Sequence, residues 1–108
     1  NLEEHIRNSD LIITGEGKLD YQTSKGKVVD RVCKLSKKHN RYVIVLAGQA
    51  TNEADIMYAR GMSSYHCIGK SPRSIEESLN EAKIDLIDSS KRVFELLSIG
   101  GNILYGAI

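Results

Sequence analysis

The chain has 108 residues, of which 41% are hydrophobic and 27% are charged, and its formal net charge at pH 7 is +1. These values are ordinary for one small globular domain, and the near-neutral charge argues against a nucleic-acid partner bound through bulk electrostatics. No apolar run approaches the roughly 20 residues that a membrane-spanning helix needs, and the first residues lack the basic and apolar regions of a signal peptide. We therefore expect a cytoplasmic protein with no membrane or nucleic-acid partner.

The first predicted elements are a short helix and a buried strand. Leu2 and Ile6 stand four residues apart, which predicts a helix that ends near Asn8. Residues 10–14 form a mostly apolar and β-branched run that ends at a glycine, a pattern typical of a parallel strand covered by helices. A polar loop with three glycines is expected over residues 15–26.

A helix and a second strand are predicted next. Apolar spacing indicates a helix from Val28 through the basic residues 37–39, which suit the negative end of the helix dipole. Asn40 is expected in the left-handed conformation just beyond the last turn. Residues 42–47 form a second buried strand, which should end at Gly48.

The sequence signals for the next two elements are weaker, and they become strong again for a long last helix. A short helix is predicted from an Asn52 cap to Gly61, followed by a third strand over residues 63–68. After Pro72, a capping box at residues 74–77 opens the long helix. Its apolar stripe comprises Ile75, Leu79, Ala82, Leu86, Val93 and Leu97.

This alternation of helices and strands predicts a parallel sheet with right-handed crossovers. The expected class is α/β, a Rossmann-like three-layer α/β/α sandwich with a mostly parallel sheet. Three strands are few for such a sheet, so we interpret the chain as an incomplete segment of the fold. Residues 98–108 are apolar and glycine-rich without a helical period. They form a tail that could be a further strand, a docking segment or a remnant without a role.

Cysteine and histidine predict no metal site. Cys33 and Cys67 fit no metal-ligand spacing, and the three histidines are scattered along the chain. We expect both cysteines to be small buried side chains in a reducing compartment, Cys33 on a helix and Cys67 in a strand.

Two glycine-bearing segments, at residues 15–17 and 48–51, leave the carboxyl edge of the predicted sheet, where ligands collect in open parallel sheets. Glycine lets backbone amides approach a ligand without a Cβ in the way. The first segment leads into a helix N-terminus near residues 24–27, where free amides and the helix dipole favour an anion. The loop matches neither the dinucleotide fingerprint nor the Walker A motif, so a phosphate would need another arrangement.

The charges of this loop have both signs. Lys18, Lys25 and Lys27 suit an anionic ligand, whereas Glu16 and Asp20 would repel it. Phosphoryl transfer from a magnesium-bound nucleotide reconciles the two signs. A carboxylate can hold the cation or accept a proton from the attacking hydroxyl, and a lysine can balance charge on the transferring group.

A purely structural interpretation stays open for the same residues. Glu16 and Lys18 could be solvated loop charges, and Asp20 could cap a turn through its side chain. Helix capping is the favoured role of Thr23 from local pattern alone, and Gln22 is a polar loop residue that could be incidental.

The stretch 10–27 closely resembles the signature of the bacterial type I glycerate kinases. In that family a strand ending in T-G-E-G precedes a basic residue and the pattern x-D-x-Q-T-x-x-G-K. Nine positions match here: Thr14, Gly15, Glu16, Gly17, Asp20, Gln22, Thr23, Gly26 and Lys27. The second strand with Gly48, the turn at Gly61 and the helix start after Pro72 also agree in order, and the resemblance extends to about Leu97.

This resemblance implies a kinase that transfers the γ-phosphate of ATP to glycerate with Mg²⁺. It implies that residues 1–97 are the C-terminal segment of the Rossmann-like domain of a two-domain enzyme, with residues 98–108 as the tail. The implied partners are glycerate, ATP and the remainder of the full-length kinase chain, and a homo-oligomer is left open. We expect the isolated chain to be inactive, because it lacks the domain that would close over two substrates.

Loop chemistry and resemblance together predict Glu16, Asp20 and Lys27 as catalytic residues. Either Glu16 or Asp20 would bind Mg²⁺ or accept the proton, and Lys27 would stabilise charge. The predicted substrate or phosphate anchors are Gly15, Gly17, Lys18, Gln22, Thr23, Gly26 and Gly48. The alternative is a non-catalytic Rossmann-like module that binds a nucleotide or an organic acid. A dinucleotide oxidoreductase is disfavoured, because Asp20 stands where its fingerprint needs a third glycine.

Overall fold

A computed structural model describes residues 1–26, 28–69 and 74–105. The chain divides into two compact units, Asn1–Cys67 and Ile68–Ile108. The elements in chain order are α1 (Leu2–Arg7), β1 (Leu11–Leu19), the 3₁₀ helix η1 (Tyr21–Lys25), α2 (Val28–Lys38), β2 (Tyr42–Ala50), the 3₁₀ helix η2 (Asn52–Asp55), α3 (Ile56–Ala59), β3 (Ser64–Cys67) and α4 (Ile75–Tyr105). Lys27 and Pro72, both named in the sequence predictions, lie outside the described residues.

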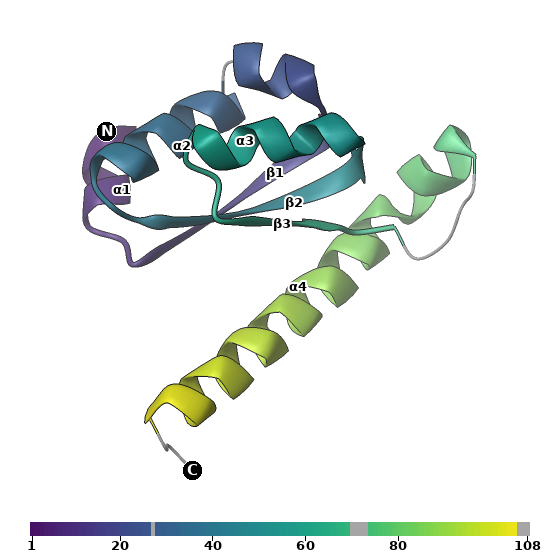
Figure 1. The fold of residues 1–108 in the computed structure, drawn as a ribbon. Helices are drawn as coiled ribbons and strands as arrows, with labels where there is room; N and C mark the ends of the chain where they lie inside the picture. The colour runs from purple at the N-terminus through teal and green to yellow at the C-terminus, as the bar shows by residue number, and fades with distance from the viewer. Residues whose placement is uncertain (27, 70–73, 106–108) are drawn as a thin grey trace. The chain divides into compact units, whose positions relative to one another are not determined.

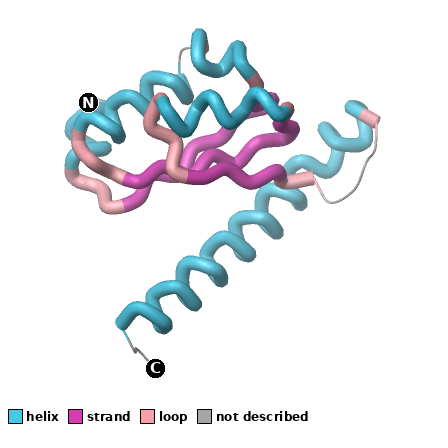
Figure 2. Tube along the Cα trace, in the orientation of Figure 1, coloured by secondary structure: helices cyan, strands magenta, loops and turns pink. Residues whose placement is uncertain are grey.

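The first unit is built on a three-stranded sheet in the order β1-β2-β3. Both strand pairs are parallel, with Leu11 opposite Tyr42 at one end of the β1–β2 ladder and Ala47 opposite Cys67 on β3. The helices α2 and α3 lie over one face of this sheet (Figure 1), and the tube view shows the same layering (Figure 2). These features confirm the predicted α/β class, an incomplete Rossmann-like fold with a parallel sheet.

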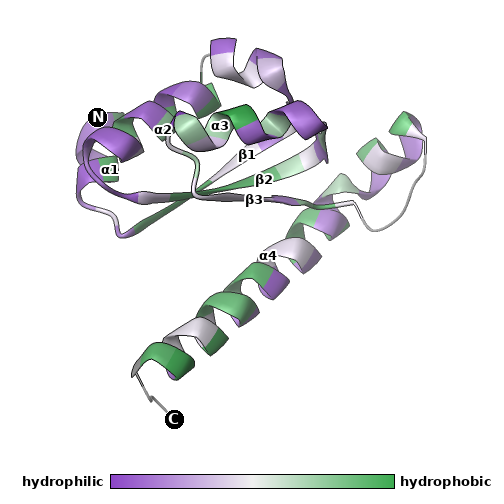
Figure 3. Cartoon of the chain, in the orientation of Figure 1, coloured by the Kyte–Doolittle hydropathy of each residue, from purple (hydrophilic) through white to green (hydrophobic). Residues whose placement is uncertain are grey.

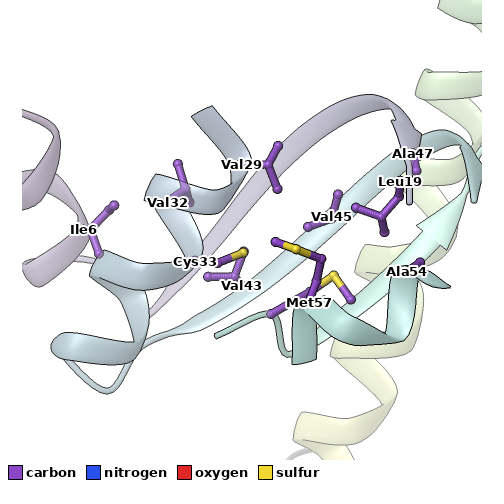
Figure 4. Close-up of a cluster of buried hydrophobic side chains, with 11 residues drawn as sticks. Ile6, Leu19, Val29, Val32, Cys33, Val43, Val45, Ala47, Ala54 and Met57 are labelled. Carbon is purple, nitrogen blue, oxygen red and sulfur yellow. The ribbon is translucent and has the colours of Figure 1, made fainter. Parts of the chain in front are cut away.

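The core of this unit lies between the sheet and its helices. Apolar side chains from α1, α2, β1, β2, η2, α3 and the turn after α3 converge in one buried cluster (Figure 4): Ile6, Leu19, Val29, Val32, Cys33, Val43, Val45, Ala47, Ala54, Met57 and Met62. Burial raises the pKa of the Cys33 thiol to about 11, so this cysteine behaves as a small hydrophobe, as predicted. Cys67 is exposed, so its predicted burial is wrong. It ends the short third strand, where the sheet leaves its side chain open.

Both leading strands are longer than predicted. The first was expected to end at residue 14 and the second at residue 47, yet they continue to Leu19 and Ala50. Residues 15–19 are therefore strand and not loop. The ladder continues through the glycines, with Glu16 opposite Ala47 and Lys18 opposite Gln49. Pairing with a neighbour outweighs the weak strand preference of glycine.

Helix boundaries follow local signals closely. Asn8 caps the end of α1, and Asn40 has a φ of 56°, as predicted. The predicted Asn52 cap is wrong, because Thr51 is the cap and its hydroxyl accepts from the amide of Glu53. The segment after it begins as 3₁₀ helix and only then becomes α3.

The second unit consists mainly of α4. Ser74 and Glu77 form the predicted capping box, since each side chain accepts a hydrogen bond from the other residue's amide. The helix continues to Tyr105, so residues 98–105 are helical although the sequence shows no helical period there, and the further strand considered for them does not form in this stretch. Extending an existing helix needs no new nucleation, which outweighs the penalty of about 1 kcal/mol for each of two glycines.

The apolar stripe of α4 is mostly open in the described part of the chain. Ile75, Leu79, Leu86 and Leu97 are exposed, and only Val93 of the large stripe residues is buried. Figure 3 shows hydrophobic residues along much of this helix. No described helix is both long enough and apolar enough to cross a membrane.

Candidate functional site

The carboxyl ends of β1 and β2 lie side by side and carry most of the predicted site. The amide of Thr51 donates to the carbonyl of Leu19 at 3.0 Å, which joins the exits of the two strands. Glu16 on β1 is half-buried beside Ala47 of β2, and Lys18 is exposed opposite Gln49. The sheet therefore brings the two predicted glycine segments to one edge, although as strand ends and not as loops.

The glycines of this edge differ in whether the structure requires glycine at their positions. A Cβ on residue 48 would lie 2.8 Å from the carbonyl oxygen of Gly17, so Gly48 is required by backbone packing. A Cβ on Gly17 would meet no heavy atom within 4 Å, and one on Gly15 would make only an ordinary contact of 3.8 Å. Neither Gly15 nor Gly17 has a positive φ. Within the described residues, nothing in packing or backbone conformation requires glycine at 15 or 17.

Asp20 and Thr23 form a reciprocal cap at the start of η1. The Asp20 Oδ1 atom accepts from the amide of Gln22 at 2.9 Å, and Thr23 Oγ1 accepts from the amide of Asp20 at 3.1 Å. Thr23 is buried, and its hydroxyl also donates to the carbonyl of Lys18 at 3.4 Å. The structural roles considered for Asp20 and Thr23 are therefore present, and a ligand would meet Asp20 in a fixed position.

The remaining predicted residues lie around η1. Gln22 is exposed. Gly26 ends the turn, with its amide donating to Thr23 and a Cβ position only 3.0 Å from the Thr23 carbonyl oxygen. The Lys25 ammonium lies 5.6 Å from the centre of the Tyr21 ring. The predicted charge stabiliser Lys27 is outside the described residues.

Glu16 and Asp20 are the carboxylates that could hold Mg²⁺ at this edge. Glu16 Oε1 accepts from the amide of Gly17 at 3.0 Å, which turns the side chain back along its own strand. No group of three or more His, Cys, Asp or Glu side chains suited to a metal occurs among residues 1–26, 28–69 and 74–105. Magnesium is commonly held by one or two carboxylates together with substrate phosphates, so either carboxylate is of a type that this ion binds.

An ion pair that the sequence did not predict joins α2 to the residue that follows α3. Arg60, just after α3, donates from Nε and Nη2 to the two carboxylate oxygens of Asp30 on α2, at 2.6 and 3.0 Å. The guanidinium holds the pKa of Asp30 below its usual range although burial opposes this, so the pair is charged at neutral pH. Asp30 stands four residues before Lys34, which indicates only a surface pair. No local signal joins residues 30 positions apart.

Comparison with known proteins decides the family. The sequence profile of the glycerate kinase family matches residues 1–98. The chain belongs to the glycerate kinase family. This match confirms the resemblance read from the strand, the glycines and the loop at residues 10–27.

Curated relatives agree with that family. Glycerate 2-kinase of Escherichia coli K12 is 33% identical over 100 residues, which cover 93% of this chain and 26% of the relative. Glycerate kinases of Bacillus cereus and Haemophilus influenzae are 31% and 26% identical, covering 86% and 91% of the chain and 24% and 26% of those proteins. The chain thus spans about a quarter of the length of these relatives.

Proposed function

We propose that the full-length protein containing this chain phosphorylates glycerate with ATP, and that the carboxyl edge of β1 and β2 forms part of its active site. Family membership supports the reaction. The observation that supports the location is that the motif residues of β1 and Gly48 of β2 lie at one sheet edge, where a Cβ on Gly17 would meet no atom of the described residues within 4 Å. Glycine there leaves room for a phosphate or a carboxylate to approach the backbone.

The acidic residues of the edge would handle the proton and the cation. Glu16 and Asp20 are the candidates, and either could accept the proton of the attacking hydroxyl or bind Mg²⁺. When bound with the phosphates of ATP, Mg²⁺ would neutralise charge on the transferring group. Asp20 is the better candidate for the base, because the amide of Gln22 holds its carboxylate in one orientation.

Basic residues near the same edge would bind the anionic substrates. Lys18 is exposed near the end of β1, and Lys25 lies in η1. Lys27 is proposed to stabilise charge in the transition state on the strength of the family pattern. Gly15, Gly26 and Thr23 would shape the backbone around the phosphate.

Two substrates and a closing cleft need more protein than this chain offers. The relatives are about four times as long, since the chain covers 24–26% of them. We expect the isolated chain to show no glycerate kinase activity, because phosphoryl transfer requires water to be excluded from the site.

The test is ADP formation by the purified full-length protein with MgATP, with and without glycerate. Glycerate-dependent ADP and a phosphoglycerate product visible by ³¹P NMR would support the proposal. Binding of ATP or glycerate by calorimetry without any ADP would support the alternative, a Rossmann-like binding module without chemistry.

A further inference from the structure

The ion pair between Asp30 and Arg60 joins two connections of the fold. Asp30 lies on α2, which follows β1 and η1, whereas Arg60 follows α3, which comes after β2. The Asp30 side chain is 7% exposed and the contact is two-pronged. Such a fork fixes orientation as well as distance between the two helices.

Two further contacts hold the end of α3 against α2. Gly61 has a φ of +118°, and a Cβ there would lie 2.1 Å from the carbonyl oxygen of Cys33. The Lys37 ammonium donates to the carbonyl of Ala59 at 2.9 Å. The end of α3 is therefore seated on α2 through backbone as well as charge.

The position of α3 matters because α3 packs against η1. That turn begins at the Asp20 cap and contains the buried Thr23. Met57 on α3 is fully buried in the same core cluster as Leu19, the last residue of β1. The turn η1 also packs against α2, η2 and β1, so α3 is one of its supports, and a shift of α3 would change the packing of η1 below Asp20.

Stability alone is a weak reason for such a pair. The Asp30 side chain is 7% exposed but the Arg60 side chain is 33% exposed, so the pair is partly buried. Replacing a buried ion pair by apolar residues is often neutral or stabilising, because removing two charges from water opposes their attraction, and an exposed pair contributes little. Lys34, 60% exposed, already offers Asp30 a cation on its own helix at 3.1 Å. Lys34 lies on the same helix as Asp30, whereas the contact with Arg60 connects α2 in a fixed orientation to the end of α3.

We propose that the Asp30–Arg60 contact is a positioning clamp that holds η1, and with it Asp20, at the carboxyl edge of the sheet. Its consequence for catalysis rests on the function proposed above. Asp30 and Arg60 are positioning residues, since they act through α3 and η1.

The first test measures the position of η1 without reference to activity. In the full-length protein, Arg60→Gln and Asp30→Asn should speed hydrogen exchange at the amides of Thr23 and Gly26, whose hydrogen bonds close η1. Lys34→Gln is the matched control, because it removes a cation from Asp30 but no link to α3. Unchanged exchange in η1 overturns the proposal. Equal acceleration at the His39 amide, which closes the far end of α2, overturns it too, because the pair would then only stabilise the unit.

The second test measures turnover in the same variants. Arg60→Gln should lower kcat for glycerate phosphorylation roughly tenfold or more, with a smaller change in KM, because misplacing a catalytic group slows the chemical step. Arg60→Lys should recover part of this loss, and Lys34→Gln should stay within about twofold of the parent. Unchanged kcat despite faster exchange in η1 overturns the catalytic part of the clamp. An inactive parent with faster exchange in η1 overturns the proposed function but supports the mechanical link.

Discussion

The carbonyl oxygen of Gly17 lies 2.8 Å from the place that a Cβ on Gly48 would occupy. Two neighbouring strands therefore approach each other at this point through backbone alone. The contact lies between the pairs Glu16–Ala47 and Lys18–Gln49, which continue the ladder on either side. A side chain at position 48 would therefore disturb the ladder at the edge where the active site is proposed.

Gly48→Ala should destabilise the chain by about 1–3 kcal/mol, because the methyl group meets backbone that can move only with the strand. Chemical unfolding of the variant and parent measures the difference. Gly17→Ala is the matched control on the facing strand, where a Cβ meets nothing within 4 Å. Equal stability of Gly48→Ala and the parent would contradict the close approach.

Gly17→Ala should lower the activity of the full-length protein without lowering the stability of its fold. We expect the free energy of unfolding to change by no more than about 0.5 kcal/mol, as is usual for an unconstrained site. In the full-length protein kcat/KM should fall by roughly tenfold or more, because the methyl group enters the space assigned to a substrate. Gly101→Ala, also with an open Cβ position, should leave kcat/KM unchanged. Full activity of Gly17→Ala would remove Gly17 from the site.

Asp20→Asn tests the proposed base while keeping the cap. Asparagine caps a helix about as well as aspartate, so the hydrogen bond from Gln22 should persist and stability should change little. Turnover of the full-length enzyme should fall by about 10²–10⁴-fold, the usual contribution of a general base. A loss within about threefold would show that Asp20 is not the base. Asp10→Asn, at the opposite end of β1, serves as the control.

Glu3 should make stability depend on acid pH. Hydrogen bonds from Lys38 and His39 lower its pKa from 4.5 to about 2. A carboxyl with a depressed folded-state pKa stabilises the fold above its unfolded pKa and loses that contribution as pH falls through the folded value. The stability difference between the parent and Glu3→Gln should therefore shrink between about pH 4.5 and 2. A difference that is constant over this window would refute the ion pair.

Gly61→Ala should be the most destabilising of the glycine substitutions, by about 3 kcal/mol or more. The φ of +118° is strained for any residue with a Cβ, and that atom would lie 2.1 Å from the Cys33 carbonyl oxygen. Gly100→Ala on α4 should instead stabilise by up to about 1 kcal/mol, because alanine favours the helix. Thermal unfolding of both variants beside the parent measures the two opposite signs. A Gly61→Ala variant that melts at or above the parent's temperature would contradict the strain at Gly61, and a Gly100→Ala variant that melts below it would contradict the helix effect.

Local patterns in the sequence were sufficient for the order of elements, the parallel α/β class and the family. The capping box at Ser74 and Glu77 and the left-handed Asn40 are local hydrogen-bond and steric preferences, which neighbouring residues decide. Apolar spacing located the buried strands because a core needs one continuous apolar surface. The motif at residues 10–27 indicated the family because it combines many matching residues at fixed spacing in one short stretch.

Tertiary structure decided where β1 ends, which glycine is required and which charges are paired. Gly15 and Gly17 read as loop residues in isolation, and only the ladder with β2 keeps them in a strand. The contact between Asp30 and Arg60 joins positions 30 residues apart, and no periodic pattern predicts such a pair. The physical reason is that propensity acts between near neighbours, whereas strand pairing and buried ion pairs depend on which distant segments the core brings together.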